Sequence, residues 1–252
     1  MSGRLVSVVM PMYNAERFVR RPVESVLGQR HGELELVVVD DGSSDGSVDL
    51  VADYARQDAR VRLLRSPRNG GVAAARNQAL DAATGRYVAF LDSDDWWHAD
   101  KLAIQLAELE RGDAAVSYAA YQRVAEDGRV LATVSPPPDL DHARLLRSNH
   151  IGNCTGIYDR QRIAAEPRFL RIGHEDYVFW LALLRAGVRA VRAGDGGMPL
   201  AWYLVRDGSQ SSNKLRAARW QWRIYRDVEG MGAVASGWHM LHYLRHALAK
   251  RR

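Results

Sequence analysis

The first hundred residues alternate between strand-like and helix-like patterns, and this alternation constrains the fold more than any other feature of the sequence. Short runs rich in Val and Leu are separated by stretches with helical periodicity. Such alternation predicts right-handed βαβ units that build a mostly parallel sheet covered by helices. The expected strands are 5–10, 34–39, 61–64 and 86–91, and the expected helices are 16–29, 48–55, 72–83 and 98–111.

Three of these strands end in polar, turn-prone clusters, at residues 11–14, 40–43 and 92–95. The carboxyl ends of parallel strands meet at one edge of a sheet, and open α/β sheets bind their ligands outside that edge. We therefore expect the three clusters to lie together and to form the functional site.

The second half of the chain is less regular. We expect a strand over 114–119, a hairpin over 121–134, a helix over 174–186 and a strand over 200–205. Pro136-Pro137-Pro138 is a rigid break and a candidate subdomain boundary. Two further helices are expected at about 214–228 and 233–249.

Composition excludes several classes of protein. Hydrophobic residues make up 47% of the 252 residues and charged residues 26%, which supports a folded core. A single cysteine, Cys154, excludes an intramolecular disulfide framework and disfavours a cysteine-rich zinc site. We expect no membrane-spanning helix, because no apolar run approaches the ~18 residues that one needs. The net charge of +5 suits phosphate-bearing ligands or an anionic membrane, whereas the scattered arginines disfavour nucleic-acid binding.

The acidic turns carry the candidate chemistry. Asp92 and Asp94, two residues apart in a tight turn, can face one hard divalent cation such as Mg²⁺ or Mn²⁺. Asp40 and Asp41 can accept hydrogen bonds from a base or a ribose, and Tyr13 can stack on a base. Taken singly, each of these is more often a turn or a helix cap.

Two further motifs bear on phosphate binding and proton transfer. Residues 68–71 and the pair Arg76-Asn77 surround an expected helix N-terminus, which suits a diphosphate. The sequence contains neither GxGxxG nor GxxxxGK[ST], which disfavours a dinucleotide dehydrogenase and a P-loop NTPase. Glu175-Asp176 opens a helix, and the residues alone leave open whether it caps that helix or supplies a general base.

Taken in order from Val6 to about Ser212, these motifs resemble the inverting family 2 glycosyltransferases of the GT-A fold. The resemblance implies a mixed, mostly parallel, Rossmann-like sheet flanked by helices. It also implies a GT-A domain over 1–212 and a helical C-terminal extension over 213–252. Within that domain, 1–112 would be the nucleotide-sugar-binding half and 113–212 the acceptor-binding half.

The resemblance also implies roles for individual residues. Asp176 matches the catalytic base, with Glu175 beside it, and Asp94 with Asp92 matches the site for Mg²⁺ or Mn²⁺. Arg206 stands near the position where some members of the family carry a metal-binding histidine, so a third protein ligand is not implied. The donor-closing loop would include Ser209, Ser211 and Ser212. The nucleotide-sugar contacts would be Pro11, Tyr13, Asn14, Asp40, Asp41, Arg68, Gly70, Arg76, Asn77, Asp92 and Ser93.

The expected activity is metal-assisted transfer of a sugar from a UDP-linked donor to a hydroxyl of a glycan or lipid-linked acceptor. A catalytically silent nucleotide-sugar-binding scaffold is an alternative, but such a protein would be expected to lack Asp94 or Asp176. A sugar-phosphate nucleotidyltransferase is another, but residues 5–20 lack its glycine-rich basic signature. We expect a cytoplasmic protein. If the last helix makes peripheral contact with a membrane, the protein would lie at the inner face of that membrane. If the helix packs on a second copy of the chain, the protein would be a homodimer.

Overall fold

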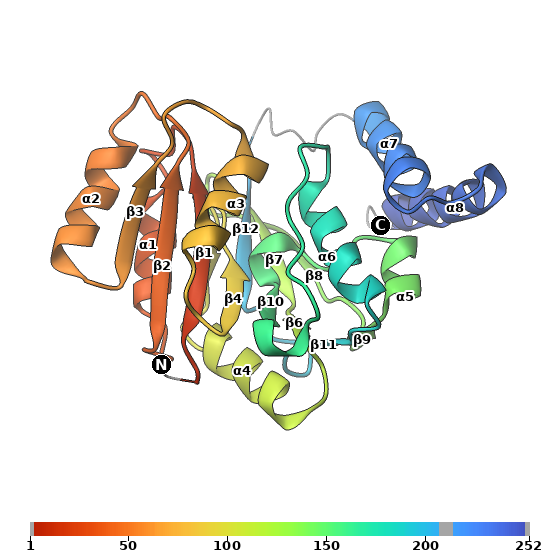
Figure 1. The fold of residues 1–252 in the computed structure, drawn as a ribbon, viewed down its shortest axis with the longest axis horizontal. Coiled ribbons are helices and arrows are strands. Elements are labelled where there is room, and N and C mark those ends of the chain that lie inside the picture. Colours follow the sequence, from red (N-terminus) through yellow and green to blue (C-terminus); the bar gives the residue numbers. More distant parts are fainter. Residues whose placement is uncertain (1–2, 207–213, 250–252) are drawn as a thin grey trace.

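A computed structural model of the chain describes residues 3–206 and 214–249. Its main sheet has the strand order β3-β2-β1-β4-β10-β6-β11-β9, and a smaller sheet has the order β5-β12-β7-β8. Helices flank the main sheet on both sides, and α7 and α8 lie at the end of the molecule farthest from α2 (Figure 1). The expectation of a mixed, mostly parallel sheet flanked by helices is thereby confirmed.

The first four strands are parallel and form the half of the sheet that was predicted from the alternating pattern. Every residue of β1 and β2 is buried, as continuous apolar runs in a parallel sheet require. The strands are β1 (Val6–Met12), β2 (Leu34–Asp40), β3 (Val61–Arg65) and β4 (Tyr87–Phe90), and the helices are α1 (Arg20–Leu27), α2 (Ser47–Gln57), α3 (Val72–Ala82) and α4 (Lys101–Arg111).

Two of these helices are shorter than expected. Helix α1 starts at Arg20 because residues 16–19 form turns. Helix α4 starts at Lys101 because residues 98–100 form a turn that follows a short strand, β5 (Trp96–Trp97), which pairs with the smaller sheet.

The strand register brings the polar strand ends together. Met12 of β1 pairs with Asp40 of β2, and Val9 of β1 pairs with Phe90 of β4. The clusters at 11–14, 40–43 and 92–95 therefore follow three neighbouring strands at one edge of the sheet, as predicted.

The second half adds short strands that a sequence pattern does not reveal. Strand β10 (Ile157–Asp159) runs antiparallel between β4 and β6, which makes the sheet mixed. The predicted hairpin is confirmed, and its first strand pairs in parallel with β12. The remaining elements are β6 (Val116–Tyr118), β7 (Tyr121–Ala125), β8 (Val130–Val134), β9 (Asp139–Leu140), α5 (His142–Arg147), β11 (Ala190–Arg192), β12 (Ala201–Val205) and 3₁₀ turns at Asn153–Thr155 and Arg160–Arg162.

Three helices complete the described chain: α6 (Glu175–Arg185), α7 (Lys214–Arg223) and α8 (Ala233–Ala249). A π-helical turn, Ile224–Val228, extends α7, so the helix expected at about 214–228 is confirmed with this change of pitch. None of the described helices is long and apolar enough to cross a membrane.

An aromatic cluster lies beneath the start of α6. The rings of Phe169 and Phe179 are stacked with centroids 4.4 Å apart, and Phe90 meets both rings edge to face at 5.1 Å. Each such ring pair stabilises the fold by about 0.5–1.5 kcal/mol in addition to the contribution from the buried apolar area of the rings. The cluster therefore anchors α6 to the end of β4.

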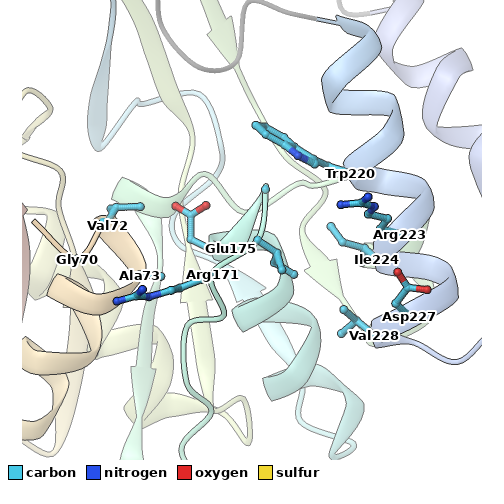
Figure 2. A pocket seen from close by; sticks show the side chains of 13 residues that line it. Gly70, Val72, Ala73, Arg171, Glu175, Trp220, Arg223, Ile224, Asp227 and Val228 are labelled. Atoms are coloured by element: carbon cyan, nitrogen blue, oxygen red, sulfur yellow. The ribbon is translucent and has the colours of Figure 1, made fainter.

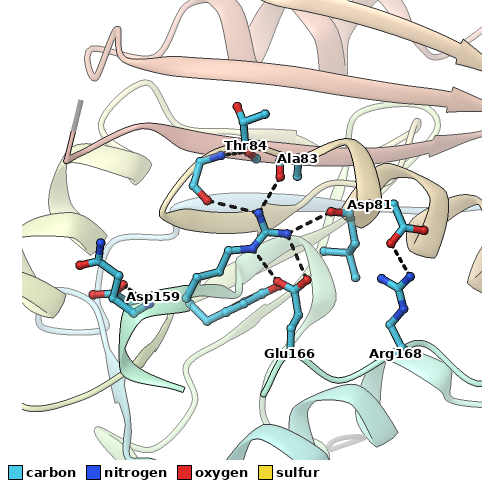
Figure 3. Close-up of polar contacts among 12 residues, drawn as sticks. Asp81, Ala83, Thr84, Asp159, Glu166 and Arg168 are labelled. Atoms are coloured by element: carbon cyan, nitrogen blue, oxygen red, sulfur yellow. Dashed lines mark hydrogen bonds and ion pairs between the residues drawn. The ribbon is translucent and has the colours of Figure 1, made fainter. Parts of the chain in front are cut away.

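A partly buried arginine holds the other end of α3. Arg160 donates to the carboxylate of Glu166 at 2.6 Å and to the carbonyls of Leu80 and Ala83 at 3.0 and 2.7 Å (Figure 3). These contacts occupy carbonyls at the C-terminal end of α3 that have no partner within the helix. Helix α3 is thereby fixed to the segment that follows β10, with its N-terminus at the functional edge of the sheet.

Candidate active site

A cleft of about 1420 Å³ opens at the carboxyl edge of the parallel strands. One wall comes from the ends of β1 and β4, another from the first turns of α3 and α6, and a third from the smaller sheet. Tyr13 projects from the first wall and is 52% exposed, so its ring offers a face to a ligand. The cleft is lined by nine of the residues singled out from the sequence: Pro11, Tyr13, Asp41, Arg76, Asp92, Ser93, Asp94, Glu175 and Asp176.

Asp41 shapes the loop that enters α3. Its carboxylate accepts hydrogen bonds from the amides of Gly70 and Gly71 at 2.8 and 2.7 Å. Gly71 has a φ of 85°, a region that favours glycine, and it is the N-cap of α3. Asp41 therefore ties the end of β2 to the helix N-terminus that faces the cleft.

Arg76 lies at the centre of the site, buried to 3% exposure. It donates to Asp92 at 2.6 Å and to Glu175 at 2.7 Å. Burial lowers the pKa of its guanidinium, but Asp92 and Glu175 more than offset this effect, so the net shift is upward and Arg76 stays charged. The arginine joins the end of β4 to the first turn of α6.

Asp94 pairs with Arg206, a contact that the sequence did not predict. Its Oδ2 atom lies 2.7 Å from Nη2 of Arg206, which directly follows β12. Burial, and then the charge of Asp92, raise the pKa of Asp94 to about 6, and Arg206 opposes the shift. The sequence indicated only that Arg206 follows the strand predicted at 200–205. It did not predict the smaller sheet, which places Arg206 beside Asp94.

The acidic turn continues with Asp95, which is fully buried and accepts the amide of Leu204 at 2.9 Å. Burial, and then the charge of Asp94, raise the pKa of Asp95. This concentration of carboxylates fits a hard divalent cation, which would relieve their repulsion. Within residues 3–206 and 214–249, no group of three or more His, Cys, Asp or Glu side chains could hold a metal. A cation here would thus need the phosphates of a substrate to complete its ligands.

Asp176 opens α6 beside Glu175. Burial, and then the neighbouring charge of Glu175, raise the pKa of Asp176 to about 6, while Arg76 opposes the shift. The carboxylate is therefore mostly ionised at neutral pH but far more basic than an ordinary aspartate. His174, just before it, has a φ of 59°, a strained conformation for a residue other than glycine. Burial lowers the pKa of His174 and keeps its ring neutral.

Other residues singled out from the sequence lie elsewhere. Asp40 is buried and accepts the amide of Ser43 at 3.2 Å, and Asn14 accepts the amide of Ser44 at 2.9 Å. Asn77 exchanges two hydrogen bonds of 2.9 Å with the backbone of Phe169. These three residues and the exposed Arg68 do not line the cleft, and Gly70 lines an adjoining cavity. Ser209, Ser211 and Ser212 lie outside the described residues.

Comparison with known proteins decides the family. The model for "Glycosyl transferase family 2" matches residues 7–161. The chain belongs to glycosyltransferase family 2. This family 2 glycosyltransferase is 37% identical over 98% of its length to "Putative teichuronic acid biosynthesis glycosyltransferase TuaG" of Bacillus subtilis, covering 97% of that protein. It is 34% identical over 97% of its length to "UDP-Glc:alpha-D-GlcNAc-diphosphoundecaprenol beta-1,3-glucosyltransferase WfgD" of Escherichia coli, covering 94% of that protein.

Solved structures share the fold of this glycosyltransferase. S. aureus TarS 1–349, in complex with UDP-GlcNAc, superposes with a TM-score of 0.69 at 23% identity, over 95% of this chain and 71% of that one. The mannosyltransferase PcManGT from Pyrobaculum calidifontis, in complex with GDP-Man and Mn²⁺, superposes with a TM-score of 0.68 at 19% identity, over 95% of this chain and 72% of that one. The predicted GT-A fold is thereby confirmed.

Proposed function

We propose that this glycosyltransferase moves a sugar from a UDP-linked donor to a hydroxyl of a glycan or lipid-linked acceptor, with inversion at the anomeric carbon. One observation carries the proposal: Asp41, Asp94 and Asp176 line one cleft, in which Arg76 bridges Asp92 and Glu175. The names of the relatives support it, because WfgD takes UDP-glucose and a diphosphoundecaprenol-linked acceptor.

The donor occupies the half of the cleft built by residues 1–112. Tyr13 stacks on the base, and Asp41 accepts from the base or ribose. Among the described residues, the buried atoms Nε of Arg76 and Nε2 of His174 have no hydrogen-bond partner. Buried polar atoms are rarely left unpaired, so a ligand oxygen beside each one would explain them. The loop with Ser209, Ser211 and Ser212 would close over the donor, and residues 113–212 would hold the acceptor.

Asp92 and Asp94 would hold Mg²⁺ or Mn²⁺, which neutralises charge on the departing diphosphate when bound. A cation at Asp94 would compete with Arg206 for this carboxylate, and Arg206 would then be available to the diphosphate. Asp92 keeps its contact with Arg76, so the turn is held in place in both states.

Asp176 then removes a proton from the acceptor hydroxyl as the hydroxyl oxygen attacks the anomeric carbon from the face opposite the leaving group. The bond from the anomeric carbon to the diphosphate breaks, and its electron pair leaves with the nucleoside diphosphate. Base assistance of this kind contributes about 10²–10⁴-fold in rate.

The test is release of UDP from candidate UDP-sugars by the wild type and by Asp176→Asn, with donor binding measured on both proteins. The proposal expects Asp176→Asn to bind UDP as the wild type does and to lose at least a hundredfold in turnover. Normal turnover by Asp176→Asn would remove Asp176 from the role of base, and absence of UDP binding by the wild type would overturn the donor class.

We further propose that α8 touches an anionic membrane surface. Val234, Trp238 and Leu241 lie on one helical face with exposures of 89%, 60% and 50%, and the exposed Arg245 continues that face by one turn. An apolar stripe with a tryptophan and a basic residue is typical of helices that lie in the membrane interface. Residues 213–252 would then be a membrane-contacting extension.

Sedimentation with vesicles that contain phosphatidylglycerol tests the membrane contact. The wild type should sediment with such vesicles, and Trp238→Ser with Leu241→Ser should not. A concentration-dependent dimer that these two changes dissolve, without vesicle binding by the wild type, would assign the stripe to a second copy of the chain and overturn the membrane proposal.

A further inference from the structure

A second cavity, of about 670 Å³, adjoins the donor cleft. It lies between the first turn of α3, the segment before α6 and helix α7 with its π-helical turn (Figure 2). Gly71, Val72, Glu175 and Trp220 line both spaces. The second cavity therefore adjoins the cleft proposed for the donor.

Charged side chains of both signs line the cavity. Arg171, from the segment before α6, and Arg223, from α7, both line it (Figure 2), and neither is in an ion pair within the described part of the chain. Both residues are exposed, and Figure 2 shows the guanidinium of Arg171 beside Ala73 of α3. Two carboxylates, Glu175 and Asp227, also line it. Glu175 is already in an ion pair with Arg76, which it shares with Asp92, so Arg171, Arg223 and Asp227 are the charged groups of this lining that have no ion pair within the described residues.

The first turn of α3 adds backbone donors to the same wall. The amides of Gly70 and Gly71 donate to the carboxylate of Asp41. The first amide of the helix that donates to a backbone carbonyl is that of Ala74, which donates to the carbonyl of Gly71 at 2.9 Å. Val72 and Ala73, which line the cavity, have no acceptor for their amides among the described residues. Free amides at a helix N-terminus favour an anion.

The remaining lining is apolar. Ile172 on one side and Ile224 with Val228 on the other form this part of the wall. A ligand that fits both parts is an anion joined to a hydrocarbon chain. Two arginines with two amides match the several oxygens of a diphosphate better than a single carboxylate.

Resting on the proposed function, we propose that this cavity binds the diphosphate and the adjoining hydrocarbon of a lipid-diphosphate-linked acceptor. Glu175 lines the cavity and its neighbour Asp176 lines the donor cleft. The first turn of α6 therefore borders both spaces.

The probe is farnesyl diphosphate, titrated by calorimetry with and without UDP, with inorganic pyrophosphate alongside. The double variant Arg171→Gln, Arg223→Gln should bind farnesyl diphosphate at least tenfold more weakly than the wild type, and UDP within twofold of it. Arg219→Gln, on the exposed side of α7, is the matched control and should change neither affinity. Pyrophosphate should bind more weakly than farnesyl diphosphate, because it gains nothing from the apolar wall.

Unchanged affinity in the double variant would overturn the inference, as would competition between UDP and farnesyl diphosphate for one site. Equal affinities for pyrophosphate and farnesyl diphosphate would contradict the proposal that the apolar wall of the cavity binds the hydrocarbon chain. If the wild type binds UDP but not farnesyl diphosphate, this inference is overturned and the proposed function stays intact. If the wild type does not bind UDP, the proposed function itself is overturned.

Discussion

A guanidinium nitrogen of Arg76 lies 2.7 Å from the carboxylate of Glu175, although 99 positions separate the two residues in sequence. The contact joins α3, which packs on the parallel half of the sheet, to α6, whose first two residues are Glu175 and Asp176. Arg76 also contacts Asp92 at 2.6 Å. One buried cation therefore sets the spacing between the donor side of the cleft and the proposed base.

Replacing Arg76 with methionine should destabilise the protein strongly, because Asp92 and Glu175 would lose their shared counter-charge. Breaking a buried ion pair in this way costs about 3–5 kcal/mol. Denaturant unfolding measures the change. Arg168→Met, which removes an exposed ion pair with Asp81, is the control and should cost no more than ~1 kcal/mol. Equal losses for the two variants would contradict the central role of Arg76.

The rate should depend on the protonation of Asp176. Because its pKa is raised to about 6, the carboxylate is protonated below that pH and can no longer accept a proton. We expect kcat/KM to fall about tenfold per pH unit below pH 6 and to level off above it. A rate that is flat from pH 5 to pH 8 would exclude Asp176 as the base.

The same shift predicts how stability depends on pH. The native state holds a proton on Asp176 up to about pH 6, whereas the unfolded chain loses it near pH 4. The stability gained from this proton is fully present below the pKa of Asp176 in the unfolded chain. It is lost as the pH rises through the pKa of Asp176 in the native state. Asp176→Asn should therefore reduce the fall in unfolding free energy between pH 4 and pH 6. An identical pH profile for variant and wild type would contradict this prediction.

Glycine at position 173 allows Trp220 to pack between the two cavities. A Cβ atom at Gly173 would lie 1.8 Å from the indole ring, which would have to move. Gly173→Ala should cost about 1–3 kcal/mol of unfolding free energy, as overpacking does. Gly237→Ala, at an open position within α8, should instead raise stability by up to about 1 kcal/mol. If both changes proved neutral, this packing of α7 against the body would be wrong.

The sequence sufficed for the parallel half of the fold because long apolar strands end in distinctive turns. Pro11, Asp41 and Asp94 could be placed at one edge because parallel strands share the direction of their ends. The strands of two or three residues, such as β5 and β10, carry no periodicity of their own and form only because neighbouring strands pair with them.

Side-chain direction was harder to predict than position. Asn77 and Arg76 are neighbours in one motif, yet Asn77 bonds the backbone of Phe169 while Arg76 reaches the cleft. Adjacent residues on a helix point about 100° apart, so only the packing of α3 decides which one faces the ligand. The pairing of Arg206 with Asp94 likewise depends on a second sheet whose register no local pattern specifies.

The proposed donor site is tested most directly by the affinity for UDP with and without Mn²⁺, measured by calorimetry on the wild type, Asp94→Asn and the exposed control Asp113→Asn. We expect Mn²⁺ to strengthen UDP binding by the wild type and by Asp113→Asn at least tenfold, and to have no effect on Asp94→Asn. Wild-type binding that ignores Mn²⁺, or a metal effect that survives in Asp94→Asn, would contradict a metal-assisted diphosphate site at Asp94.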